Sequence, residues 1–302
     1  MERSRPGSQY PVTVNIIICH SGAMEQDPVI NDMEVKDGRY SPSLEHVEIE
    51  VDGETMFGVL FKAQGPGPKP TVVLLHGFPG HERNFDIAHS LKRAGFNVLV
   101  FHYRGAWGSD GTFSFSNMLE DTKAAVEHLR ENCMELLVDP DHIIPIGHSM
   151  GGWAAMMTAS EDARINAVGS LAGFNLGLVN IFSAEGEPNR DFIENTFKEL
   201  TRPLHSLSPV ELLKEIESKG DEWNLLERTR RLSDLKVLMI GAKNDPLAWP
   251  KFHFDALAVD LRSYLSDDLA TIMLDSDHNF SSKRITLSKK VVAWCKHSTT
   301  EK

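Results

Sequence analysis

The sequence predicts an α/β fold in which a mostly parallel sheet of eight strands is flanked by helices. Apolar runs with the length of strands alternate with amphipathic helical segments over most of the chain, and this alternation is typical of parallel sheets covered on both faces. The turn pair Asp52-Gly53 separates the first two apolar runs. These two strands are therefore expected to form a hairpin that adds an antiparallel edge to the sheet.

Each strand is predicted from a short run of β-branched and aliphatic residues. Ligand sites in sheets of this kind lie at the carboxyl ends of the strands, so the residues that follow each strand carry most of the functional information. In chain order, the strands are expected at residues 46–51, 55–62, 71–75, 97–103, 143–146, 165–171, 237–240 and 269–274.

Each helix is predicted from apolar residues that recur on one face or from a signal at its end. Gly95 is placed to end a helix at 83–94. Ser208, Pro209 and Glu211 form the N-cap, the first position and the capping box of a helix that Gly220 ends. The other helices are expected at 118–129, 149–160, 189–200, 250–265 and 285–296.

Residues 175–232 interrupt the alternation, because they hold amphipathic helices and no convincing strand; Trp223, Leu225 and Leu226 suggest a third helix there. The apolar faces of these helices must be buried, and the ends of the strands are the expected surface, which would make the insertion a cap over a site. An insertion packed away from the site is the alternative. The expected domains are an irregular N-terminal arm at 1–45, an α/β core at 46–174 and 233–302, and a helical cap at 175–232.

Composition limits the classes of partner. The 302 residues are 41% hydrophobic and 25% charged, which suits one large globular domain or two modest ones. The net charge of −12, without a basic cluster, makes nucleic acid a poor partner. The chain lacks the uninterrupted run of about 18 apolar residues that a membrane span requires. Its oligomeric state is left open, with a homo-oligomer among the alternatives.

The cysteines and the N-terminus bear on location. Cys19, Cys133 and Cys295 lack a Cys-x-x-Cys spacing, so neither a disulfide scaffold nor a zinc site is expected. Residues 12–19 are mostly apolar, but the run is interrupted by Asn15 and is short for a signal peptide. An extra edge strand and a cytoplasmic location are expected, with export as the alternative.

Residues 147–151 read Gly-His-Ser-Met-Gly, which is the pattern Gly-x-Ser-x-Gly, and they lie between a predicted strand and a predicted helix. In this setting the pattern forms a sharp turn that lifts the serine hydroxyl clear of the sheet, and the glycines leave room for the turn. The N-terminus of the following helix favours developing negative charge. Ser149 is therefore a candidate nucleophile, with an ordinary glycine-rich turn as the alternative.

A serine nucleophile needs a base that takes its proton and an acid that orients the base. His278 directly follows the last predicted strand and is the candidate base, and Asp245 follows the strand before it and is the candidate acid. Asp275 and Asp277 compete with Asp245, although their closeness to His278 in sequence makes an approach to its Nδ1 awkward.

The other histidines are expected to have no catalytic role. His148 neighbours Ser149 along the backbone and is interpreted as a packing residue, and His253 falls inside a predicted helix. His76, His81 and His102 lie near strand ends and are candidates to line a pocket, but they precede the serine in the chain.

Acyl transfer also needs N–H donors for the tetrahedral oxyanion, each worth about 3–4 kcal/mol of barrier. The backbone N–H of Met150, directly after the serine, is one candidate. Residues 76–80, His-Gly-Phe-Pro-Gly, follow a predicted strand, and the N–H of Phe78 is the other. A plain tight turn is the alternative at this loop.

Two tryptophans and one arginine lie near the same strand ends. Trp107 and Trp249 are candidate substrate-binding residues of an apolar acyl pocket, with a place in the core as the alternative. Arg104 is expected to brace neighbouring loops rather than touch substrate.

These motifs together resemble the α/β-hydrolase superfamily. The loop at 76–80, Tyr-Arg-Gly at 103–105, the turn at 147–151, Asp245 and His278 occur in that family's order, and the resemblance runs from about residue 46 to the C-terminus. The chain is most similar to serine esterases and to the catalytic domains of prolyl-oligopeptidase-like enzymes. It departs from those peptidases because it has no room for their N-terminal propeller.

The resemblance implies the α/β-hydrolase fold with a helical cap, and a serine hydrolase that cleaves carboxylic esters through an acyl-enzyme on Ser149. A small-molecule acyl substrate is expected, and no metal or organic cofactor is required. A small aminopeptidase, an amidase or an acyltransferase would use the same residues. A non-catalytic ligand-binding protein of the same fold is the alternative outside enzymes.

Overall fold

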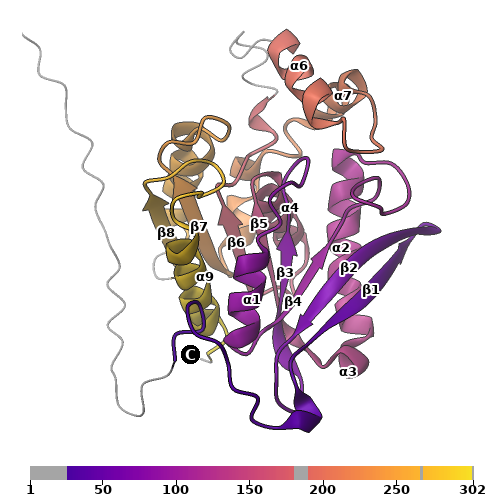
Figure 1. The fold of residues 1–302 in the computed structure, drawn as a ribbon. Coiled ribbons are helices and arrows are strands. Elements are labelled where there is room, and N and C mark those ends of the chain that lie inside the picture. The colour runs from indigo at the N-terminus through magenta and orange to yellow at the C-terminus, as the bar shows by residue number, and fades with distance from the viewer. Residues whose placement is uncertain (1–25, 180–189, 266–267, 301–302) are drawn as a thin grey trace, which may run out of the picture.

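The structure is a computed structural model that describes residues 26–179, 190–265 and 268–300. Within these ranges eight strands form one sheet in the order β1-β2-β4-β3-β5-β6-β7-β8 (Figure 1). The two pairs that involve β2 are antiparallel and the rest are parallel, which confirms the predicted fold class. The strands are β1 (Ser43–Val51), β2 (Glu54–Lys62), β3 (Lys69–Leu75), β4 (Asn97–Phe101), β5 (Val138–His148), β6 (Ala167–Leu171), β7 (Lys236–Ala242) and β8 (Leu269–Leu274).

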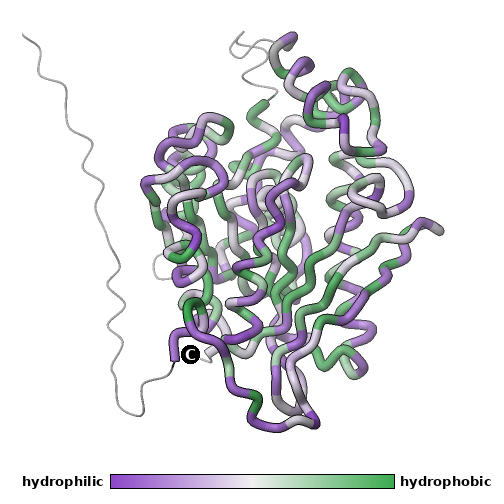
Figure 2. The backbone as a smooth tube through the Cα atoms, viewed as in Figure 1, coloured by the Kyte–Doolittle hydropathy of each residue, from purple (hydrophilic) through white to green (hydrophobic). Residues whose placement is uncertain are grey.

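Helices cover both faces of the sheet. Along β3, Val73 and Leu75 point into one core cluster and Val72 and Leu74 into the other, as the two-residue period of a strand requires. One face packs against α2 (Phe115–Glu131), α4 (Met150–Glu161) and α8 (Ala256–Arg262), and the other against α1 (Phe85–Arg93) and α9 (Arg284–Ser298). Figure 2 shows the hydrophobic residues gathered in the central strands between these layers.

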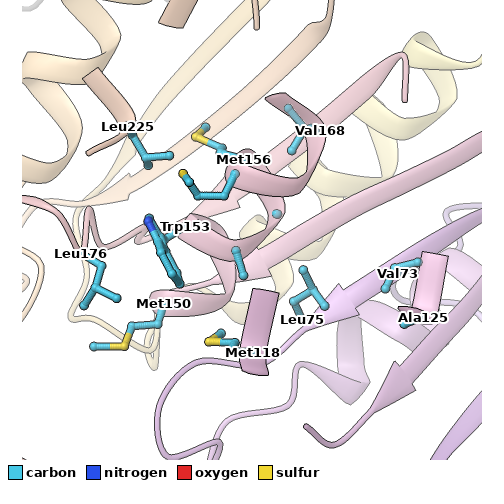
Figure 3. Close-up of a cluster of buried hydrophobic side chains, with 14 of the residues drawn as sticks. Val73, Leu75, Met118, Ala125, Met150, Trp153, Met156, Val168, Leu176 and Leu225 are labelled. Atoms are coloured by element: carbon cyan, nitrogen blue, oxygen red, sulfur yellow. The ribbon is translucent and has the colours of Figure 1, made fainter. Parts of the chain in front are cut away.

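The helix α4 is buried over nearly its whole length. Its residues from Met150 to Ser160 are all buried, because its side chains cluster with Val73 and Leu75 of β3 on one side and with Leu176 and Leu225 on the other (Figure 3). The indole N–H of Trp153 also donates to the Trp223 carbonyl at 2.9 Å. The helix that begins directly after Ser149 is therefore held by packing on several sides.

The inserted segment contains α6 (Arg190–Leu200) and α7 (Pro209–Lys219), and the predicted capping box is present at the start of α7. The third predicted helix is wrong. Two 3₁₀ turns occupy its place, η2 (Leu225–Glu227) and η3 (Thr229–Leu232), because the buried Trp223 and Leu225 serve the core of α4 rather than a helix face of their own.

The helix predicted at 250–265 is also different in detail. A π-helical turn, η4 (Lys251–Asp255), precedes α8, and the helix ends at Arg262. At the N-terminus, β1 begins at Ser43, inside the segment expected to be an arm, and the edge strand expected at 12–18 lies outside the described residues.

The insertion is fastened to the core at the carboxyl end of β4. Its segment 204–207 pairs with the loop after β4 through bridges at Ala106 and Phe113. The Glu215 carboxylate of α7 accepts hydrogen bonds from the N–H groups of Phe115 and Ser116 at 2.9 and 3.0 Å. Because these donors form the positive end of α2, a carboxylate there is stabilising.

No helix in the described part of the chain is long and apolar enough to span a membrane. Cys133 and Cys295 are free thiols, and Cys19 lies outside the described residues.

Arg104 forms a buried ion pair at the start of the loop after β4. Its Nε donates to Asp121 Oδ1 at 2.6 Å and its backbone N–H to Asp121 Oδ2 at 2.8 Å. Asp121 is completely buried. Burial raises the pKa of Asp121 to about 6, against the hydrogen bonds and charge of Arg104, which lower it. The pKa of Asp121 in the folded state thus lies above its unfolded value. Ionisation of Asp121 therefore lowers the free energy of unfolding above about pH 6, and this loss is absent below about pH 4.

Arg104→Met should lower the free energy of unfolding by about 3–5 kcal/mol at neutral pH, because it leaves the buried Asp121 carboxylate without its cationic partner. The loss should shrink toward pH 4, where Asp121 is protonated. Urea denaturation at several pH values measures this, and the double variant Arg104→Met/Asp121→Asn should recover part of the loss. A loss that does not depend on pH would contradict the assignment of the effect to Asp121.

Candidate active site

Ser149 occupies the turn between β5 and α4 with φ 57° and ψ −124°. A positive φ is strained for a residue with a side chain and persists where the surroundings enforce it. Here the Ser149 N–H donates to the Leu171 carbonyl at 2.9 Å. The flanking glycines are required by space, since a Cβ at Gly147 would overlap the Gly151 carbonyl and one at Gly151 would overlap the Leu75 carbonyl.

Asp245 and His278 meet at the ends of the neighbouring strands β7 and β8. His278 Nδ1 lies 2.6 Å from Asp245 Oδ2, and both residues are buried. The other carboxylate oxygen of Asp245 accepts hydrogen bonds from the N–H groups of Leu247 and Ala248 at 2.8 and 2.9 Å. These two amides leave the aspartate in one orientation, with Oδ2 directed at the imidazole.

The two competing aspartates are engaged elsewhere. Asp275 accepts a hydrogen bond from the side-chain amide of Asn244 at 2.8 Å, and Asp277 accepts one from the Ser281 N–H at 2.7 Å. The structure therefore places Asp245, and neither of the others, on the Nδ1 atom of His278.

His278 is joined to the end of β5 through His148, the residue before Ser149. His148 Nε2 lies 2.8 Å from the His278 carbonyl oxygen, and the two rings are 4.8 Å apart between centroids. Among the described residues, neither Ser149 Oγ nor His278 Nε2 has a hydrogen-bond partner. Such bonds between nucleophile and base commonly tighten only when substrate is bound.

The loop after β3 packs directly on Ser149. A Cβ at Gly77 would lie 2.8 Å from the Ser149 Cβ and 3.1 Å from the His148 carbonyl oxygen, so only glycine allows this approach. The Phe78 ring stacks on Phe113 at 5.3 Å and meets Phe197 of the inserted helix α6 edge to face at 5.6 Å. The loop that contains the Phe78 N–H is thus held between the Ser149 turn and an aromatic cluster.

The two tryptophans predicted to bind substrate have different surroundings. The Trp107 indole N–H donates to the Pro79 carbonyl at 2.7 Å, and the Arg83 guanidinium lies over the Trp107 ring at 4.6 Å. Trp107 therefore supports the loop after β3. Trp249 is 45% exposed, and its indole N–H donates to the Pro246 carbonyl at 2.9 Å.

Four histidines that are buried or partly buried lie in or next to the loops of the site. Burial lowers the pKa of His76 and of His148 to about 3, and that of His102 and of His253 to about 4. These rings are therefore neutral at physiological pH.

Sequence reasoning missed the contacts of two of these histidines. His148 was expected to be a packing residue and His253 part of an ordinary helix. His253 Nδ1 accepts the Asn175 N–H at 3.1 Å, and its ring stacks on Phe174 at 4.3 Å. Nothing in the local pattern shows where a side chain points in the folded chain, so no signal in the sequence could have identified these contacts.

A model of the alpha/beta hydrolase family matches residues 72–284. Among curated proteins, the chain is similar to the uncharacterized protein YfhR of Salmonella typhimurium, with 32% identity over 83 residues. It is also 32% identical over 114 residues to the quorum-quenching protein AidA of Acinetobacter baumannii. The matches cover 27% of this chain and 27% of YfhR, and 36% of this chain and 36% of AidA.

Among solved structures, the fold is similar to that of the esterase Pf2001 of Pyrococcus furiosus. The TM-score is 0.61 at 17% sequence identity, with 90% of this chain and 96% of that chain covered. At this identity the likeness concerns the fold alone.

Gly77→Ala should lower the free energy of unfolding by about 1–3 kcal/mol, because the added methyl group overpacks the contact with the Ser149 turn. Gly38→Ala is the matched control, since a Cβ there has nothing within 4 Å. Thermal or urea unfolding of the two variants measures the difference. Equal stability of both variants would contradict the close packing of the loop on Ser149.

Proposed function

Since the chain belongs to the alpha/beta hydrolase family, whose model matches residues 72–284, we propose that it is a serine hydrolase that cleaves carboxylic esters through an acyl-enzyme on Ser149. The observation that carries the proposal is the contact of 2.6 Å between Asp245 Oδ2 and His278 Nδ1, at the sheet edge that also holds the strained Ser149 turn. The cytoplasmic location stays a prediction.

In the acylation step, His278 Nε2 takes the proton of the Ser149 hydroxyl while Oγ attacks the carbonyl carbon of the ester. The N–H groups of Phe78 and Met150 donate to the tetrahedral oxyanion. Collapse of this intermediate breaks the bond to the alcohol, which receives its proton from His278. Water then enters, gives a proton to His278 and attacks the acyl-enzyme, so that the acid leaves and Ser149 regains its proton.

Asp245 contributes by orienting the base. Because its carboxylate accepts the Nδ1 proton of His278, the lone pair of the neutral imidazole is at Nε2, where the serine proton must go. The negative charge also stabilises the imidazolium that forms during each step. The amides of Leu247 and Ala248 support this role, since they prevent the carboxylate from rotating away.

The aromatic cluster around Phe78 supports a substrate whose acyl chain is apolar. Phe78 is half-buried and packs with Phe113, Phe115 and Phe197. The inserted helices would then act as a cap, with Phe197 of α6 packed edge to face against Phe78.

Ser149→Ala should abolish labelling by a fluorophosphonate probe, because the probe reacts with an activated serine hydroxyl. Labelling followed by peptide mass spectrometry should locate the adduct on Ser149 in the wild-type protein. Wild-type protein that is folded and does not react would contradict an enzyme and favour a ligand-binding protein of this fold.

Asp245→Asn should lower kcat by about 10³–10⁴-fold, because the amide stabilises the wrong tautomer of His278. Asp275→Asn is the matched control and should retain activity, since Asp275 contacts Asn244 instead. The measurement uses p-nitrophenyl esters of rising chain length together with aminoacyl amides. Preference for the amides over every ester would replace the esterase with an aminopeptidase or amidase.

A further inference from the structure

His148 lies directly before Ser149 at the end of β5, and its side chain contacts the loop after β8. The Nε2 atom is 2.8 Å from the His278 carbonyl oxygen, and the two imidazole rings are 4.8 Å apart between centroids. His148 is 3% exposed, so this hydrogen bond is shielded from water. One residue therefore joins the backbone of the nucleophile turn to the backbone of the candidate base.

The direction of the bond fixes the state of the ring. A carbonyl oxygen only accepts hydrogen bonds, so Nε2 of His148 must carry a proton. Burial lowers the pKa of His148 to about 3, and the charges of His278 and Arg284 also lower it, whereas the hydrogen bond to the His278 carbonyl and the charge of Asp245 raise it. His148 is therefore a neutral donor, and it adds no positive charge beside the imidazole of His278, which must become cationic during the reaction.

In the described part of the chain, the other backbone hydrogen bonds of the loop after β8 involve residues on either side of His278. The Asn244 N–H donates to the Ser276 carbonyl at 3.0 Å, and the Phe280 N–H donates to the Asp277 carbonyl at 3.0 Å. Asp245 holds the tip of the His278 side chain. Among the described residues, the hydrogen bond from His148 is the contact that ties the backbone of His278 to β5, the strand that ends directly before Ser149.

We propose that His148 is a positioning residue whose Nε2–H sets the distance between the His278 imidazole and the Ser149 hydroxyl. This inference rests on the proposed serine hydrolase function and deepens it. A purely structural histidine at this position would contribute to folding. A positioning histidine would also contribute to the rate of proton transfer, and the donor rather than the ring would be the feature that matters.

The test compares His148→Gln with His148→Met. Glutamine retains an N–H donor on a side chain of similar length, whereas methionine has the same length as glutamine and no donor. His148→Met should lower kcat for a p-nitrophenyl ester by about tenfold with little change in KM, as expected for one lost neutral hydrogen bond. His148→Gln should retain most of the wild-type kcat, and the rate of fluorophosphonate labelling should follow kcat.

Circular dichroism and thermal unfolding establish that both variants are folded. A kcat of His148→Met equal to that of the wild type would overturn the inference, and so would an equal fall in both variants. Labelling of the wild-type protein at Ser149 would show that such a result concerns His148 alone and leaves the proposed function in place. Absence of labelling would overturn both the hydrolase and the positioning role.

A measurement on the wild-type protein keeps the inference testable if the variants do not fold. Nitrogen NMR of histidine-labelled protein should show His148 as the neutral tautomer with the proton on Nε2 at neutral pH. A ring protonated on Nδ1 alone, or a cationic ring, would overturn the inference.

Discussion

The contact between Asp245 and His278 depends on the order of the strands more than on any local sequence. β7 and β8 are neighbours and parallel, with Ala242 opposite Leu274 at their carboxyl ends, so the loops that follow them emerge side by side. A pair of residues 33 positions apart can then meet at 2.6 Å. Because two backbone amides hold the aspartate, the imidazole is oriented by a partner that is itself fixed, which is how a buried polar contact becomes specific.

The turn at Ser149 is also positioned by neighbouring strands. β5 lies beside β3, so the loop after β3 reaches the Ser149 turn. Gly77 in that loop and Gly151 after the serine allow the two backbones to approach each other closely. The strained Ser149 backbone is retained because the helix α4 that follows it is buried from Met150 to Ser160. The insertion adds Phe197 to the cluster under Phe78, and Glu215 fastens it to α2.

Much of the fold could be predicted from the sequence, because each strand and helix follows from a short-range pattern. The positions of Ser149, Asp245 and His278 after their strands came from the same reasoning, and the structure brings Asp245 to His278. The contacts of the side chains around the site could not be predicted. Trp107 supports a loop, and His148 contacts the backbone of residue 278, because the direction of a side chain depends on neighbours that are distant in sequence.

Proton NMR of the uninhibited protein tests the central contact most directly. The proton shared between His278 Nδ1 and Asp245 should give a strongly deshielded, slowly exchanging resonance. We expect this resonance in the wild-type protein and in Ser149→Ala, and we expect its loss in Asp245→Ala and in His278→Gln. A wild-type spectrum without such a resonance, or a resonance that persists in Asp245→Ala, would contradict the account.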